Sequence, residues 1–241
     1  GERGSRPITR PDGTIVVPIH AAHLGPDGCY HNPGGGYTFS DCMTLLGTWQ
    51  EDGTLAWEAS ERVVGDPSVS TRGFVEPTIA QLADGTILMV MRGSNDARPD
   101  ELTGHKWQAR STDGGRTWDA PRPWTYGDGT AFYSPSACSQ LLPWRDGRIL
   151  WIGNICEANS RGNDPRYPLV LGEVDPATGL LDRASVRVID DLRPEDEGFI
   201  GLSNFYARED RETGELLLHL TRSCPGRRWE GDALLFRMRV D

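Results

Sequence analysis

One eight-residue motif, S-x-D-x-G-x-T-W, constrains the fold of this chain more than any other feature, and it runs from Ser111 to Trp118. In a motif of this type, Ser and Asp side chains bond the backbone of a tight turn, and Gly supplies the positive φ that the turn needs. We expect Thr117 to start a new strand, with the Trp118 indole packed back over the turn. The motif therefore predicts a β-hairpin and supplies no chemistry of its own.

Turns of a second kind recur along the whole sequence. Four Asp-Gly or Thr-Gly pairs precede apolar stretches, at intervals of 72, 62 and 67 positions, and their glycines are Gly13, Gly85, Gly147 and Gly214. We expect inner strands before three of these turns, at 76–82, 134–142 and 203–208. Worn copies of the eight-residue motif stand at 50–57 and 175–179. A strand unit that recurs at a long, regular period is typical of the blades of a β-propeller.

The repeat predicts an all-β propeller with about four four-stranded blades, roughly 1–66, 67–130, 131–196 and 197–241. A six-bladed propeller at this repeat length needs roughly 360–400 residues. We therefore expect residues 1–241 to form a single propeller domain or the C-terminal part of one, without its first blades. An open propeller leaves two sheet edges with unpaired backbone groups, which predicts self-association through these edges.

Composition and charge argue against several classes of protein. The net charge of −10 argues against a nucleic-acid partner, because phosphate binding needs a basic surface. No apolar run approaches the roughly 20 residues of a membrane span. Five cysteines without a C-x-x-C pair, and histidines without ligand spacing, predict neither a disulfide framework nor a metal site, and no motif calls for a cofactor. No signal peptide is visible, but the first residue is Gly1 rather than Met, so secreted and cytoplasmic locations both stay open.

Polar side chains recur where inner strands begin and second strands end, which is where the sites of propellers lie. We expect them to converge on the central axis. The inner-strand set is Glu76, Ser134 with Ser136, and Ser203 with Asn204, and the second-strand set is His20, Arg92, Asn154 and Arg222. His20 fits either a satisfied rim histidine or a proton shuttle.

Glu76 and Arg92 form the most specific pair of this set. Burying a carboxylate at the start of an apolar strand costs free energy unless the group is paired or hydrogen-bonded. Arg92 is the last residue of the partner strand in the same hairpin. The pair could be a structural ion pair at the mouth of the barrel. It could also be functional, with Glu76 as a base or electrostatic partner and Arg92 gripping a substrate carboxylate through two parallel bonds.

The polar segment 154–169 holds a second candidate, Arg166. An arginine at this mouth would complement Arg92 from the next blade. The alternative is a solvated loop closed by Arg166 and Asp164. Arg161 is a weaker candidate, because a flexible loop holds it poorly.

With these residues in place, the chain resembles the sialidase (neuraminidase) superfamily of Asp-box propellers, also called BNR-repeat propellers. The resemblance rests on the Asp box at 111–118, on the segment from Glu76-Pro77-Thr78 to Arg92, and on 166–170. It implies three arginines that bind a sugar carboxylate, a tyrosine nucleophile backed by a glutamate, and an acid/base aspartate. By position, Glu76 resembles the glutamate, Arg92 the second arginine and Arg166 the third.

One departure from the family pattern concerns the nucleophile. The tyrosine usually precedes a Ser at the start of an inner strand, where this chain has Leu202 before Ser203. Tyr206 is too deep in its strand, and Tyr133 stands at an equivalent axis position one blade earlier. The resemblance implies a glycoside hydrolase that removes a terminal acidic sugar from a glycan. Its expected catalytic residues are Glu76 and Tyr133, and the expected substrate-binding residues are Arg92, Arg166, His20, Asn154, Ser134 and Asn204. One alternative is a non-catalytic carbohydrate-binding propeller, which Leu202 favours, and another is a scaffold propeller used for protein contacts.

Overall fold

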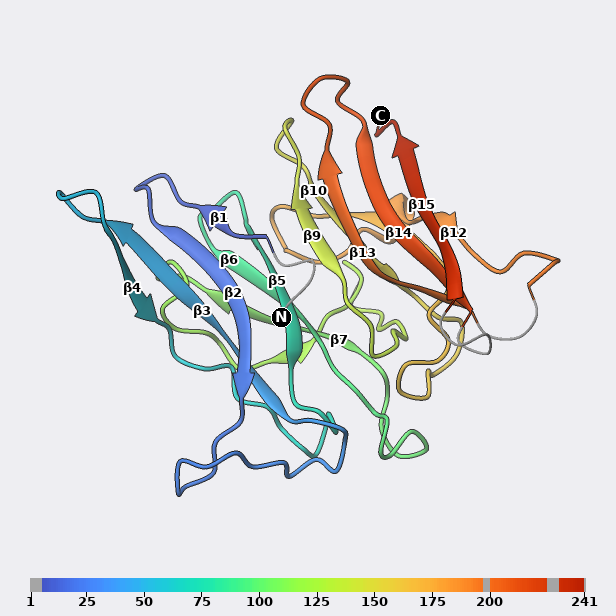
Figure 1. Cartoon of the computed structure of the whole chain (residues 1–241), viewed down its shortest axis with the longest axis horizontal. Coiled ribbons are helices and arrows are strands. Elements are labelled where there is room, and N and C mark those ends of the chain that lie inside the picture. The colour runs from blue at the N-terminus through green and yellow to red at the C-terminus, as the bar shows by residue number, and fades with distance from the viewer. Residues whose placement is uncertain (1–5, 197–199, 225–229, 241) are drawn as a thin grey trace.

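The computed structural model describes residues 6–196, 200–224 and 230–240. In this part of the chain nearly all regular structure is β-strand, and the helical element is a single 3-10 turn, η1 (Arg183–Ser185). Four antiparallel sheets follow one another in sequence order and fan out side by side (Figure 1). The all-β propeller with four blades is therefore confirmed.

Each sheet is a simple up-and-down meander of neighbouring strands. The first sheet contains β1 (Ile8–Thr9), β2 (Ile15–Ala22), β3 (Ser40–Trp49) and β4 (Leu55–Ala59). The second contains β5 (Val75–Gln81), β6 (Ile87–Arg92), β7 (Lys106–Ser111) and β8 (Arg122–Pro123). The third contains β9 (Gln140–Pro143), β10 (Ile149–Asn154), β11 (Leu169–Val174) and β12 (Arg187–Asp190). Among the described residues the fourth has three strands, β13 (Gly201–Glu209), β14 (Leu216–Cys224) and β15 (Glu230–Met238).

The Asp-Gly pairs form the tight turns that connect the first strand of a blade to its second strand, as predicted. In the second blade, Gly85 has a φ of +88° and its amide donates to the Leu82 carbonyl at 3.0 Å. The Asp84 carboxylate accepts a hydrogen bond from the Thr86 amide at 2.9 Å. A left-handed glycine after a tight turn is the geometry of a short hairpin loop, and Gly is the residue that adopts it without strain.

The eight-residue motif forms the turn between the third and fourth strands of the second blade. One oxygen of Asp113 accepts hydrogen bonds from the Ser111 hydroxyl and from the amides of Arg116 and Thr117, at 2.7 to 3.1 Å. The strand expected to begin at Thr117 begins only at Arg122. The carboxylate bonds bend the chain back toward Asp113, and before Arg122 the contact with β7 is made by Asp119, whose amide donates to the Arg110 carbonyl at 2.9 Å.

The core consists of apolar layers between neighbouring blades. In the layer between the second and third blades, the Trp124 and Trp151 rings lie edge to face with centroids 5.2 Å apart, and both side chains are buried. Aromatic pairs of this kind add about 0.5–1.5 kcal/mol beyond their buried area. The blades therefore stack through side chains, while hydrogen-bonded ladders hold each blade together.

Polar side chains on the inner strands also join one blade to the next. The Thr78 hydroxyl accepts a hydrogen bond from the Leu141 amide at 2.9 Å, which joins the second blade to the third. The Gln140 amide oxygen accepts from the Ala207 amide, also at 2.9 Å, which joins the third blade to the fourth. Thr78 and Gln140 hold the same register position in their blades, opposite Val90 and Ile152.

Two details of the expected register are wrong. The third inner strand begins at Gln140 rather than at Ser134, because the amides of Ser134 and Ser136 bond the carbonyls of Gly104 and Gly162 instead of β10. In the fourth blade, Arg222 points away from the axis and ion-pairs with Asp190 at 2.7 Å. Successive residues of a strand face opposite sides, so a shift of one position reverses the side chain.

Candidate functional site

The site lies at the end of the propeller where β5 begins and β6 ends. A β-bulge interrupts the β5–β6 ladder between Val75 and Thr78, and within it Glu76 has a φ of +50°. This conformation costs a non-glycine residue roughly 1–2 kcal/mol. The Glu76 amide donates to Nδ1 of His20 on the preceding blade at 3.3 Å, and this contact helps to hold the bulge.

The fourth blade has the same bulge at the start of its inner strand. Asn204 has a φ of +57°, and its amide donates to the Cys138 sulfur on the preceding blade at 3.3 Å. The register makes Glu76, Cys138 and Asn204 equivalent positions of successive blades. Cys138, rather than Ser134 or Ser136, is therefore the residue of the third blade at this position.

Glu76 and Arg92 form the ion pair that the sequence predicts. Nη1 of Arg92 donates to Oε1 of Glu76 at 2.6 Å, and Nε of Arg92 donates to the Ser136 hydroxyl at 2.8 Å. The Arg92 side chain is buried, while that of Glu76 keeps 24% of its surface exposed. Burial raises the pKa of Glu76, but the charge and hydrogen bond of Arg92 act against it and the net pKa is lowered. Glu76 is therefore a carboxylate anion at neutral pH.

Arg166 lies beside this pair. Its Nη2 donates to the Ser136 carbonyl at 3.1 Å, so Ser136 accepts hydrogen bonds from both arginines. The Arg166 side chain is buried. Burial and then the charge of Arg92 lower the pKa of Arg166. Two guanidinium groups are thus held close together by neutral oxygen atoms and one carboxylate, which favours an additional anion at this place.

Asn154 fixes the backbone that carries Arg166. The Asn154 side-chain amide donates to the carbonyls of Arg166, Pro168 and Leu202, each at 3.1 Å. The Ser134 hydroxyl in turn donates to the Asn154 carbonyl at 2.7 Å. Asn154 and Ser134, predicted to bind substrate, thus anchor the segment behind Arg166.

Several buried polar atoms of this region have no hydrogen-bond partner among the described residues. They are Oε2 of Glu76, Nε of Arg166, Nε of Arg72 and Oδ1 of Asn154. Buried polar groups are nearly always satisfied in folded proteins, so a cluster of exceptions is characteristic of a place where a ligand or water binds. Glu76 thus bonds Arg92 through one oxygen, while its other oxygen is buried and has no partner among the described residues.

The structure adds two charged residues that sequence reasoning missed. Arg72 donates to the Thr38 hydroxyl at 2.8 Å, and its pKa is lowered by burial and by the charge of Arg92. Arg72 holds the same register position in the second blade as Ser134 in the third. The spacing between Ser134 and its hairpin glycine therefore predicts Arg72 when it is applied to the second blade. Lys106 is completely buried below the site, and no local pattern marks it as such.

The remaining predicted residues lie apart from the ion pair. Tyr133 is 40% exposed and pairs through its backbone with Cys156, and within the described region no hydrogen bond joins its hydroxyl to Glu76. Asn204 is exposed at the outer face of the fourth blade. Leu202, at the position expected for a tyrosine, is completely buried in the core. The nucleophilic role of Tyr133 stays a prediction.

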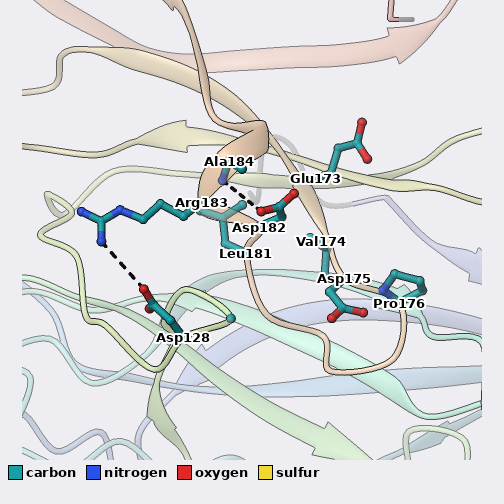
Figure 2. A pocket seen from close by; sticks show the side chains of 10 residues that line it. Asp128, Glu173, Val174, Asp175, Pro176, Leu181, Asp182, Arg183 and Ala184 are labelled. Carbon is teal, nitrogen blue, oxygen red and sulfur yellow. Dashed lines mark hydrogen bonds and ion pairs between the residues drawn. The ribbon is translucent and has the colours of Figure 1, made fainter.

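A surface hollow of about 520 Å³ lies away from this site, beside β11 and η1 (Figure 2). Its charged groups are already engaged in local structure. Arg183 lies 3.8 Å from Asp128, and Asp182 accepts a hydrogen bond from the Ala184 amide at the start of η1. Despite its size, the hollow offers no converging groups for chemistry.

The described residues lack a metal cluster and a membrane-spanning helix. They contain no group of three or more His, Cys, Asp or Glu placed to hold a metal ion. Nor does any of their helical structure have the length and apolar character needed to cross a membrane.

Known proteins with similar folds include sialidases. The Trypanosoma rangeli sialidase has a TM-score of 0.53 at 15% identity, over 95% of this chain and 30% of that protein. The NanB sialidase from Streptococcus pneumoniae has a TM-score of 0.54 at 16% identity, over 90% and 27%. A Dyadobacter fermentans protein of unknown function has a TM-score of 0.58 at 18% identity, over 96% and 51%. The chain thus spans about half the length of these structures or less.

Sequence comparison gives a family assignment. No curated protein matches the chain. A family model, described as a BNR repeat-like domain, matches residues 4–185, which is more than half of the sequence. Together with the four-bladed propeller and its sialidase-like fold, this match shows that the chain belongs to the family of BNR repeat-like domains.

Proposed function

We propose that the chain acts as a glycoside hydrolase that removes a terminal acidic sugar from a glycan. The observation that carries this proposal is the ionised Glu76, held by Arg92 through one oxygen while its other oxygen has no hydrogen-bond partner in the part of the chain that the structure describes. Arg92 and Arg166 would bind the sugar carboxylate, and Arg72 would add a third positive charge. Charge-assisted bonds from guanidinium groups to a carboxylate are among the strongest that side chains form.

The state of Glu76 limits the role that it can have. A carboxylate that is ionised at neutral pH cannot donate a proton, so Glu76 would act as a base or as an electrostatic partner of the positive charge that develops on the sugar. Glycoside hydrolysis passes through an oxocarbenium-like transition state, which a fixed negative charge stabilises. If Tyr133 is the nucleophile, its hydroxyl must reach Glu76 when substrate is bound.

The test is an assay of the full-length protein against fluorogenic glycosides of several acidic and neutral sugars. We expect turnover of an acidic sugar and a fall of at least about 100-fold in kcat for Glu76→Gln, since acid–base catalysis contributes roughly 10²–10⁴. Arg237→Met is a matched control, because Arg237 is exposed at the far end of β15. Absence of turnover for every acidic sugar, or an unchanged rate in Glu76→Gln, contradicts the proposal.

A second candidate function is carbohydrate binding without hydrolysis. The buried Leu202 favours it, because a core leucine stands where the family has its nucleophile. Calorimetry with intact oligosaccharides separates the two functions. Binding that requires Arg92 and Arg166, with no product after long incubation, would support binding alone.

A further inference from the structure

Lys106 is the only lysine of the chain, and it is completely buried where β7 begins. Its ammonium group donates to the Pro135 carbonyl at 3.4 Å and to the Ala137 carbonyl. Lysine is almost never fully buried unless it is paired. Among the described residues no carboxylate lies within ion-pair distance of Lys106, so its charge is met by neutral carbonyl groups.

These bonds place Lys106 in the same framework as the two site arginines. Arg92 bonds the Ser136 hydroxyl and Arg166 bonds the Ser136 carbonyl, while Lys106 bonds the carbonyls on either side of Ser136. Three cations from two blades thus converge on one tripeptide, residues 135–137. Arg92 and Lys106 are also direct partners in the β6–β7 ladder.

The charged and titratable groups that act on Lys106 come from β5, β6, the segment before β9 and the 155–168 loop. Arg92 on β6 and Arg166 on the 155–168 loop disfavour its positive charge, while Glu76 on β5 and the Cys138 thiol before β9 favour it. Cys156 also interacts with it, but burial raises the pKa of that thiol to about 11, so it stays neutral. Burial and then Arg92 lower the pKa of Lys106 to about 7.

We propose that Lys106 is the titratable member of this cation cluster, and that an anion bound beside Arg92 and Arg166 draws a proton onto it. The inference rests on the proposed function, since it concerns the carboxylate site of that function. A bound carboxylate offsets the repulsion from the two arginines and so favours the protonated lysine. By linkage, the anion then binds more tightly when Lys106 is protonated. Lys106 is a positioning residue, because it is buried behind the groups that would touch the ligand.

The single lysine makes the direct test unambiguous. Protein labelled with ¹³C-lysine gives one set of lysine signals, and the Cε shift is followed by NMR from pH 5 to 10. We expect a midpoint near pH 7 in the free protein. Saturation with N-acetylneuraminic acid should raise the midpoint by about one pH unit or more. A midpoint above pH 9 in the free protein, or one that does not move on saturation, overturns the proposal.

Binding measurements give a second, independent readout. A rise of the midpoint from pH 7 to pH 8 corresponds to a dissociation constant about sevenfold weaker at pH 8.5 than at pH 6. In Lys106→Arg the charge is permanent, and in Lys106→Met it is absent, so both variants should lose this pH dependence. If neither variant folds, the NMR titration of the wild-type protein decides.

A weak probe separates failure of this inference from failure of the proposed function. If no acidic sugar binds at any pH, the proposed function fails. The titration is then repeated in acetate, with chloride at equal ionic strength as the control. A Lys106 midpoint that rises in acetate and not in chloride supports the inference, and equal midpoints in the two salts overturn it.

Discussion

Removing Arg92 should lower the free energy of unfolding much more than removing the charge of Glu76, although the two residues form one ion pair. Arg92→Met leaves the carboxylate with three quarters of its surface buried and without its ion-pair partner, although the more distant charges of Lys106 and Arg166 still favour its ionised form. Breaking a buried pair in this way costs about 3–5 kcal/mol, and partial exposure of Glu76 places the cost near 3 kcal/mol. Glu76→Gln removes the counter-charge of Arg92 but keeps an oxygen for it, and the hydrogen bonds of Arg92 to Ser136 and Asn163 remain, so we expect a cost of about 1 kcal/mol. In the double variant no charge is stranded, so we expect a cost near 2 kcal/mol.

Urea denaturation of the wild type, the two single variants and the double variant at pH 7 measures these costs as a double-mutant cycle. The singles together cost about 4 kcal/mol and the double variant about 2, so the coupling energy should be about 2 kcal/mol. For a chain of this size, Arg92→Met should also lower Tm by about 6–12 °C. A coupling below about 0.5 kcal/mol would refute the reasoning, because it would mean that the two charges do not act on each other in solution.

The same cycle has a defined pH dependence. The folded-state pKa of Glu76 is lowered from its ordinary value of 4.5, so the stability that it contributes is fully present above about pH 4.5. This contribution is lost as the pH falls through the lower, folded-state pKa. The coupling energy should therefore hold from pH 7 to 5 and shrink below about pH 4. A coupling that is unchanged at low pH would show that it does not arise from the carboxylate charge.

Three further substitutions test the turn, the anchor and the added arginine. Asp113→Ala should lower the free energy of unfolding by about 2 kcal/mol in urea denaturation, because it removes the acceptor of the Asp-box turn; a change below about 0.5 kcal/mol would contradict this. Asn154→Ala should cost about 2–3 kcal/mol and weaken acidic-sugar binding in calorimetry, since it frees the segment that holds Arg166. Arg72→Met should weaken that binding about tenfold with less than about 0.5 kcal/mol lost in stability, because the hydrogen bond of Arg72 within the described residues is to a hydroxyl and the Tyr37 ring lies 5.9 Å from its guanidinium carbon; equal affinity would exclude it from the site.

The sequence predicts the blades well because their turns are locally encoded. A glycine with positive φ marks the first hairpin of each blade, and seven positions later the second strand delivers a residue to the axis end. This offset identifies His20, Arg92 and Asn154 in the first three blades. In the fourth blade the same offset gives Thr221. The prediction of Arg222 was wrong because adjacent residues of a strand point to opposite faces of the sheet.

The parts that sequence reasoning missed depend on contacts between blades. Segment 134–139 contains residues typical of a strand start, but its amides and carbonyls bond loops and cationic side chains that are distant in sequence. Lys106 finds its carbonyl partners 29 and 31 positions further along the chain, in the next blade. Neither periodicity nor local spacing records a contact of that kind. The charges of Glu76, Arg92 and Arg166 were therefore predictable one by one, while the burial of Lys106 and the shared support on residues 135–137 were not.

The hydrogen bonds between inner strands are arranged in one sense along the propeller, joining the backbone of one blade to a side chain of the blade before it. In each of two successive junctions, a side chain of the earlier blade accepts from the backbone of the later one, through Thr78 and then Gln140. Tyr206 holds the same register position in the fourth blade, where it is 42% exposed. Within the described residues, the last blade thus offers an acceptor side chain at this position, while the partner that a following blade provides is a strand backbone. Copies that associated through the two ends of the array would join head to tail. Such contacts build a closed ring or an open filament, and not a two-fold symmetric dimer.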